Sequence, residues 1–165
     1  MEVVGIDEEK VKTISSIKKE EDWVRDYRID SYQKFESIEM PDFGPEIDLD
    51  FSKIIYYKNN DQDEKIKNDW NNILKPIVDE LDSVGVRESE IHMGGMGVQY
   101  ESEVIYHSML QEIEDKKVIF TSIERAMKDY PELVQKYFGK IVRNDENKFA
   151  ALNGAVFSGG SFIYV

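Results

Sequence analysis

Cysteine is absent from this chain of 165 residues. Without a thiol, the segment forms no disulfide, offers no thiolate nucleophile and supplies no cysteine ligand to zinc or to an iron–sulfur cluster. Histidine is nearly as scarce, because His92 and His107 are the only two imidazoles. From these shortages we expect no catalytic residue, no cofactor-binding residue and no metal ligand in the segment.

Long apolar runs are also missing. No stretch approaches the roughly 20 apolar residues that cross a bilayer, and no apolar run follows a basic start as in a signal peptide. Basic residues are outnumbered, with 21 Lys and Arg against 34 Asp and Glu and a formal net charge of −13. Nucleic acid and anionic membranes bind clustered cations, so we expect neither as a partner. The expected compartment is the cytoplasm.

Apolar residues at helical spacing, together with caps and breakers, predict a helix-rich α+β segment. The helices are expected at residues 7–19, 21–40, 76–85, 108–116, 121–128, 131–139 and 146–156. Asp7 should cap the first helix, and Pro41 should stop the second. Trp23, Tyr27 and Phe35 recur at helical spacing, which predicts that all three lie on the buried face of the second helix.

β-Branched and aromatic residues predict short strands. These are expected at residues 53–57, 98–106, 117–121 and 159–165, and a polar connector at 57–70 is the best candidate for local disorder. The last strand has no partner after it in the sequence, so it would pair with another chain's edge, pair with the chain's own strand near residues 118–120, or be disordered. An unpaired apolar strand is a template for association. We therefore expect the front piece of a longer protein, with self-association through this strand as the leading outcome for the isolated piece.

Two features resemble functional motifs without fulfilling them. His92 and His107 lack metal-binding spacing, although Glu90 and Glu103 lie nearby in the sequence, and two ordinary surface or core-edge histidines are the favoured interpretation. The glycines of residues 94–97 lack the phosphate-loop pattern with its lysine, so we expect a tight turn there. No serine occupies a nucleophile elbow.

Several stretches of the sequence resemble SufB, the scaffold component of the SUF iron–sulfur cluster assembly machinery. The opening residues 11–23, followed by Tyr27 and Arg28, resemble the start of that family, with Glu21 where the family often has Pro. Residues 99–107 and 118–120 resemble its "Gln-Tyr-x-Ser-Glu" and "Val-Ile-Phe" segments, with Lys117 in place of Gly. The most specific resemblance lies in residues 130–139, 147–153 and 159–165.

The resemblance implies a division of the chain and a set of partners. Residues 1–145 would form the helix-rich N-terminal domain, and residues 146–165 the entry helix and first strand of a truncated right-handed parallel β-helix. In the family, that β-helix carries the groups attributed to cluster assembly, and a C-terminal region docks the ATPase SufC. The implied function is a non-enzymatic part of a complex with SufC and SufD, without a cluster in this segment.

Two other classes of function remain open from the sequence. A stand-alone acidic interaction module would dock a basic partner such as a sulfurtransferase. A small hydrolase would use His92, His107 and a nearby Glu.

Overall fold

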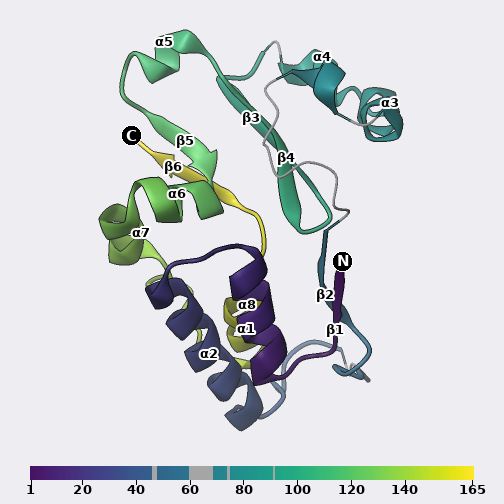
Figure 1. Cartoon of the computed structure of the whole chain (residues 1–165), viewed down its shortest axis with the longest axis vertical. Helices are drawn as coiled ribbons and strands as arrows, with labels where there is room; N and C mark the ends of the chain where they lie inside the picture. Colours follow the sequence, from purple (N-terminus) through teal and green to yellow (C-terminus); the bar gives the residue numbers. More distant parts are fainter. Residues whose placement is uncertain (46–47, 60–68, 74, 91) are drawn as a thin grey trace. The chain divides into compact units, whose positions relative to one another are not determined.

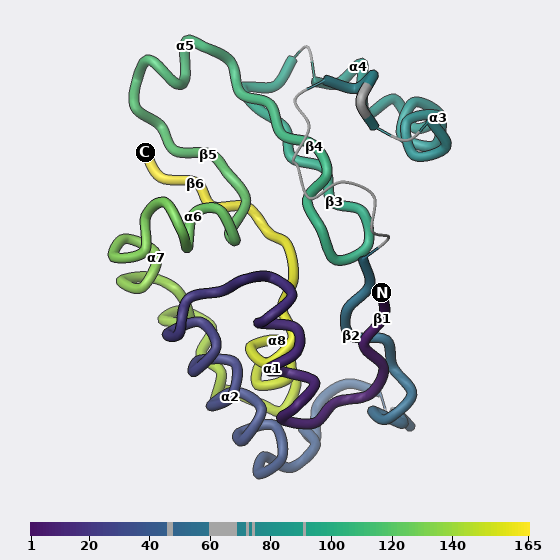
Figure 2. Tube along the Cα trace, viewed as in Figure 1, coloured from purple at the N-terminus to yellow at the C-terminus, as the bar shows by residue number. Residues whose placement is uncertain are grey.

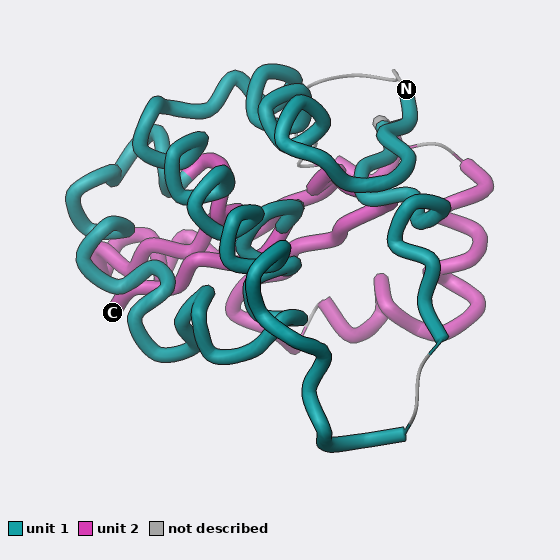
Figure 3. The backbone as a smooth tube through the Cα atoms, turned by 90° about the horizontal axis from the view of Figure 1, so that it is seen from below, with its two compact units in different colours: residues 1–59, 126–158 teal, residues 60–125, 159–165 magenta. Residues whose placement is uncertain are grey.

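Helices alternate with short strands along the chain (Figure 1). The computed structural model describes residues 1–45, 48–59, 69–73, 75–90 and 92–165. These residues form three two-stranded antiparallel sheets besides the helices, which confirms the α+β class. The chain divides into two compact units, residues 1–59 with 126–158 and residues 60–125 with 159–165 (Figure 3). Most of the predicted connector, residues 60–68, lies outside the described residues.

Three helices build the first unit. They are α1 (Glu8–Ile17), α2 (Asp22–Ser37) and α8 (Lys148–Val156), which lie side by side in Figure 2 although α8 is far away in sequence. Two further helices, α6 (Ile123–Asp129) and α7 (Pro131–Tyr137), precede α8, and strands β1 (Glu2–Val4) and β2 (Ile55–Lys58) pair at the edge. No described helix is long and apolar enough to span a bilayer.

Local end signals explain where these helices begin. The Asp7 carboxylate accepts the backbone N–H of Lys10, and the Asn147 side chain accepts those of Phe149 and Ala150. Pro131 occupies the first turn of α7, where its missing N–H costs nothing. The predicted start of the first helix and the predicted Pro131 helix are therefore confirmed.

Small residues let α2 and α8 approach closely. Ser31, Ala151 and Ala155 are fully buried between them. A Cβ atom added to Gly154 would lie 2.6 Å from the Ser31 hydroxyl oxygen, which is closer than real Cβ contacts. Glycine is therefore required at this crossing.

A buried arginine ties α2 to the end of α8. Arg28 is 0% exposed, and its guanidinium donates two hydrogen bonds to the Glu20 carboxylate at 2.7 and 2.6 Å. It also donates to the carbonyl oxygens of Ala155 (3.1 Å) and Phe157 (2.9 Å) and lies 3.8 Å from the Phe157 ring centre. A buried charge is tolerated when it is paired and hydrogen-bonded, as here.

The second unit contains a hairpin, a second strand pair and short helices. Its elements are η1 (Trp70–Asn72), α3 (Lys75–Ser83), α4 (Val86–Glu90), β3 (Gly95–Tyr100), β4 (Glu103–Met109), α5 (Gln111–Glu114), β5 (Ile119–Ser122) and β6 (Ser161–Tyr164). Its apolar core gathers Ile73, Val78, Met96, Val98 and Tyr106.

Two sequence-based predictions are wrong in this unit, and one alternative that the sequence left open is decided. The single strand expected at 98–106 is a hairpin, because the chain reverses at Glu101, which has a positive φ of 53°. Ser108 lies in β4 and caps nothing, while Leu110 precedes α5. Of the three partners left open for the terminal strand, the structure shows the chain's own strand, since β6 pairs antiparallel with β5 from Ser161↔Ser122 to Tyr164↔Ile119. The parallel β-helix and the boundary at residue 145 stay predictions.

Candidate functional site

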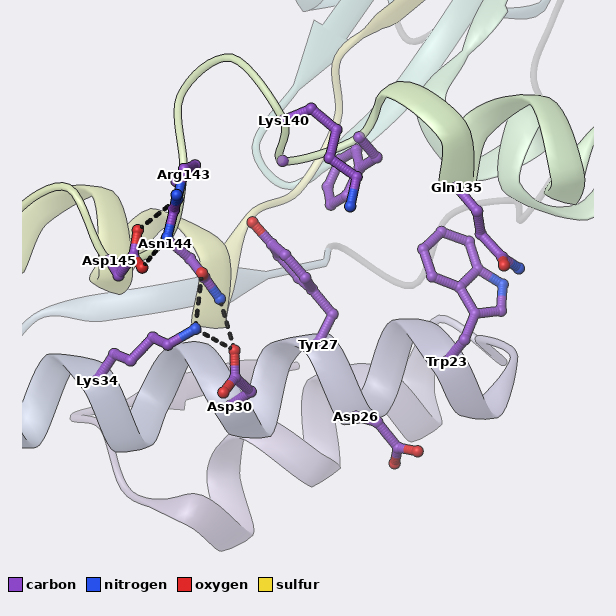
Figure 4. Close-up of a pocket in the computed structure, with 12 residues that line it drawn as sticks. Trp23, Asp26, Tyr27, Asp30, Lys34, Gln135, Lys140, Arg143, Asn144 and Asp145 are labelled. Atoms are coloured by element: carbon purple, nitrogen blue, oxygen red, sulfur yellow. Dashed lines mark hydrogen bonds and ion pairs between the residues drawn. The ribbon is translucent and has the colours of Figure 1, made fainter.

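A groove of about 690 Å³ lies in the first unit, between α2 and the segment that links α7 to α8 (Figure 4). Aromatic, amide, acidic and basic side chains share its lining. Residues 138–147 form the linking segment, which we call the α7–α8 loop. Because a concave surface with a few converging polar groups is the usual form of a binding site, this groove is the candidate.

Aromatic rings form one wall of the groove. The Phe138 ring packs edge-on against Trp23 and Tyr27, with ring centroids 6.4 and 5.1 Å apart. Burial raises the pKa of the Tyr27 hydroxyl. The indole N–H of Trp23 is buried and meets no hydrogen-bond acceptor among the described residues. A buried donor without an acceptor is costly, so the wall carries an unmet hydrogen bond.

This arrangement corrects the buried face that periodicity predicts for α2. Phe35 is buried, but Trp23 and Tyr27 are only partly buried and line the groove. The buried residues of α2 are Val24, Arg28, Ser31 and Phe35.

Asn144 fixes the loop to α2. It is 8% exposed, and its amide nitrogen donates to Asp30 Oδ2 (2.9 Å) and to Ser31 Oγ (2.7 Å). Its amide oxygen accepts from Lys34 Nζ (3.0 Å), which also donates to Asp30 (2.7 Å), as the dashed lines in Figure 4 show. Burial alone would raise the pKa of Asp30, but the hydrogen bonds from Lys34 and Asn144 outweigh it and lower that pKa.

The acidic groups of the groove are matched within the chain. Arg143 donates to both carboxylate oxygens of Asp145, at 2.9 and 2.5 Å, and this hydrogen bonding lowers the pKa of Asp145. Asp26 lies 3.3 Å from the Arg25 guanidinium. By contrast, the Lys140 ammonium forms no hydrogen bond or ion pair with a described residue. The groove therefore offers the unmatched Lys140 cation, while the unmatched indole N–H is buried in its wall.

The two histidines occupy different elements of the second unit. His92 follows α4 and is exposed, whereas His107 lies in β4 with its ring 4.9 Å from that of Phe120. Burial lowers the pKa of His107, and its Nε2 is buried without a partner among the described residues. No group of three His, Cys, Asp or Glu in the described part of the chain is placed to hold a metal ion.

Glu90 is committed to a structural network. Its carboxylate accepts hydrogen bonds from Trp70 Nε1 (2.7 Å), Tyr106 OH (2.5 Å) and the Ser108 hydroxyl. Burial alone would raise the pKa of Glu90, but these three donors lower it. A carboxylate held ionised by three donors is a poor proton donor at neutral pH. The contacts of Glu90 therefore give the hydrolase alternative no support.

The glycine run gives no phosphate cradle. Gly95 and Gly97 lie within β3 and face Met109 and His107 across the hairpin. The expected turn is confirmed only at its start, because the chain bends at residues 92–94 directly before β3, whereas Gly95 and Gly97 belong to the strand.

The comparisons with known proteins identify the family. The family described as the SufBD protein N-terminal region matches residues 9–165. The chain belongs to the SufBD family. It is 40% identical over 163 residues to an iron-sulfur cluster assembly SufBD family protein of Staphylococcus saprophyticus. A protein of the same description from Staphylococcus aureus strain USA300 is 42% identical over 164 residues. Each match covers 98% of this chain but 35% of the relative, so the chain spans about a third of those proteins.

Sequence reasoning missed the groove residues of the α7–α8 loop. Lys140 and Asn144 stand between two predicted helices, where no periodic pattern assigns a role. The available signal was the adjacent pair Ile141 and Val142, which is apolar, lies outside any element and is flanked by Lys140 and Arg143.

Proposed function

We propose that this chain is the N-terminal region of a SufB-type scaffold for iron–sulfur cluster assembly. It acts in the cytoplasm, without catalysis of its own, in a complex with the ATPase SufC and with SufD. The observation that carries the proposal is the family match over residues 9–165, together with relatives whose names describe iron–sulfur cluster assembly. The resemblance of residues 130–139, 147–153 and 159–165 to SufB supports that branch of the family.

The cluster chemistry of the whole protein lies outside these 165 residues in this proposal. The reason is chemical, because clusters are held mainly through cysteine thiolates and the chain has none. A right-handed parallel β-helix that follows β6 is the proposed location. Anaerobic reconstitution of the purified chain with iron and sulfide should leave it colourless. A stable brown species with stoichiometric iron and sulfide would contradict this assignment.

Complementation tests the assembly role. The complete reading frame that contains this chain is expressed, with a tag, in a bacterium that depends on SUF and lacks its own SufB. We expect restored activity of cluster-dependent aconitase and co-purification of SufC and SufD with the tagged protein. A matched control replaces the host SufD instead of SufB. Restoration in the SufD-deficient strain alone would contradict the SufB assignment, and restoration in neither strain, without co-purification, would contradict the assembly role.

A further inference from the structure

One edge of the terminal strand β6 is open. Among the described residues β6 pairs with β5 alone, so its second edge carries no strand (Figure 1). The Ile123 N–H donates to the Gly160 carbonyl oxygen at 3.0 Å, which sets the alternation of the ladder. In an antiparallel pair, alternate residues direct their backbone groups toward the partner. The backbone groups of Phe162 therefore face β5, and those of Ser161 and Ile163 face the open edge.

No charge, proline or bulge protects that edge. Natural edge strands carry such features because an unpaired row of N–H and C=O groups attracts other strands. The residues Ser161–Tyr164 include neither a charged residue nor a proline, and the β5–β6 register runs without a shift. The registers of β1–β2 and β3–β4 both shift. Ile163 is 63% exposed and Val165 is 95% exposed. These features are typical of a strand that another strand covers in the assembled protein.

The opposite side of this strand pair is closed. Ser122 of β5 is buried, and residues 119–121 are partly buried. The His107 imidazole of β4 hydrogen-bonds to the Phe120 backbone, and the two rings lie 4.9 Å apart. A Cβ atom on Gly95 would lie 2.6 Å from the Phe120 ring, so β3 also lies directly against β5. A further strand can therefore join at β6, whereas the hairpin occupies the far side of β5.

Tethering decides between two candidate occupants of the open edge. A second copy would have to overcome the repulsion between two chains of net charge −13. The edge of a four-residue strand is only about 13 Å long, too short for the roughly 800 Å² a side of a stable interface. A strand in the same polypeptide is present at an effective concentration of about millimolar. The match to an N-terminal region covers 35% of each relative, so the rest of such a protein is long enough to supply that strand.

We propose that the open edge of β6 binds a strand from the part of the complete protein that follows Val165. β5 then caps the enlarged sheet, because it occupies the other edge of β6 and limits growth of the sheet to one direction. The new strand covers the exposed Ile163 side chain and pairs with the backbone groups of Ser161 and Ile163. The existence of that following part rests on the proposed function, whereas the open edge is a property of the described residues.

Hydrogen–deuterium exchange tests the proposal on unmodified proteins. The chain of 165 residues is compared with the complete protein by mass spectrometry that resolves single amides. We expect the Phe162 N–H, which faces β5, to be protected in both proteins. The Ile163 N–H should exchange at least about a hundredfold more slowly in the complete protein, because its edge is then paired. Equal exchange of Ile163 in the two proteins would overturn the proposal. Protection of Ile163 in the shorter chain that rises with its concentration would also overturn it, and would assign the edge to a second copy.

Two proline variants provide a matched test, because proline removes one backbone N–H. Ile163→Pro removes an N–H on the open edge, where a strand tolerates proline, so the urea midpoint of the shorter chain should stay nearly unchanged. In the complete protein the same change should lower the midpoint, because it removes a hydrogen bond to the added strand. Phe162→Pro breaks the β5–β6 ladder and should lower the midpoint of both proteins. An equal effect of Ile163→Pro in the two proteins would contradict the pairing.

Complementation is scored separately from these measurements. Protection of the β6 edge with failed complementation contradicts only the assembly role. Successful complementation without protection of the edge contradicts only this inference.

Discussion

The exchange Arg28→Met tests whether the buried guanidinium is a structural requirement of the first unit. Methionine retains part of the apolar volume but removes every hydrogen bond and the charge. Glu20, whose side chain is 5% exposed, would then be left as a buried carboxylate without its partner. The carbonyl oxygens of Ala155 and Phe157 would each lose a donor.

The expected cost follows from these losses. Removal of one partner of a buried ion pair destabilises a protein by about 3–5 kcal/mol, because the other charge stays buried and uncompensated. Loss of the two carbonyl hydrogen bonds and of the ring contact at 3.8 Å increases the cost. The energies of neighbouring interactions do not simply sum, so no separate amount is added for them. We therefore expect the free energy of unfolding to fall by about 3–5 kcal/mol. With urea m-values of about 1–3 kcal/mol per M, the urea midpoint should fall by at least about 1 M.

Urea unfolding followed by far-UV circular dichroism measures the effect. The double variant Glu20→Leu/Arg28→Met replaces both charges by apolar side chains and should recover a large part of the loss, since an apolar replacement of a buried pair is often neutral. Arg25→Met is the matched control, because Arg25 lies on the same helix with a side chain that is 43% exposed. A loss below about 1 kcal/mol in Arg28→Met, the size expected for an exposed pair, would refute the reasoning.

Two further predictions concern pH and one glycine. The pKa values of the Asp30 and Glu90 carboxyl groups are lower in the folded chain than in the unfolded chain. The stability that these two carboxylates contribute is therefore complete above their unfolded pKa of about 4. It is lost as the pH falls through their lower folded pKa values. The urea midpoint should therefore drop on acidification below about pH 4, and Asp30→Asn should reduce that drop. Gly139→Ala should cost more than about 1 kcal/mol, because φ is +65° and its Cβ would meet α2. Gly44→Ala is the control, with φ at +88° but open space around it, and an equal loss in both variants would refute the role of the contact.

Helix ends were predictable because their signals lie within a few residues. Asp7 before Glu8 and Pro131 at a first turn act through their own neighbouring backbone groups, so the sequence is sufficient to locate them. The same holds for Gly139, which follows α7 in a left-handed conformation. The family was recognisable for a different reason, because the resemblance depends on the order of many residues along the chain.

The buried face of α2 was less predictable, because burial depends on partners from other parts of the chain. Arg28 is an unlikely core residue by type, and only Glu20 and the end of α8 make its burial acceptable. Trp23 and Tyr27 have the residue types and the spacing of a core stripe, yet they form the wall of a groove. An aromatic residue at a binding surface and one in a core follow the same helical pattern.

The hairpin and the terminal strand show two different limits. Apolar and polar residues do alternate from Val98 to Tyr106, but the chain reverses at Glu101. The sequence has neither glycine nor asparagine at that position, the residues that usually mark a tight turn. The partner of β6 is β5, about 40 residues earlier in the sequence. That strand was one of three possible partners, and only the tertiary structure selects among them. An apolar strand without a following partner in the sequence is therefore not an unpaired strand in space.

The groove joins these observations into one argument about function. Two carboxylates, those of Asp30 and Glu90, stand in hydrogen-bond networks that hold elements together. Among the described residues, the groups of the groove without a hydrogen-bond or ion-pair partner include the Lys140 ammonium and the buried Trp23 indole N–H. Charged, amide and aromatic side chains that converge on a concave surface are typical of a binding site.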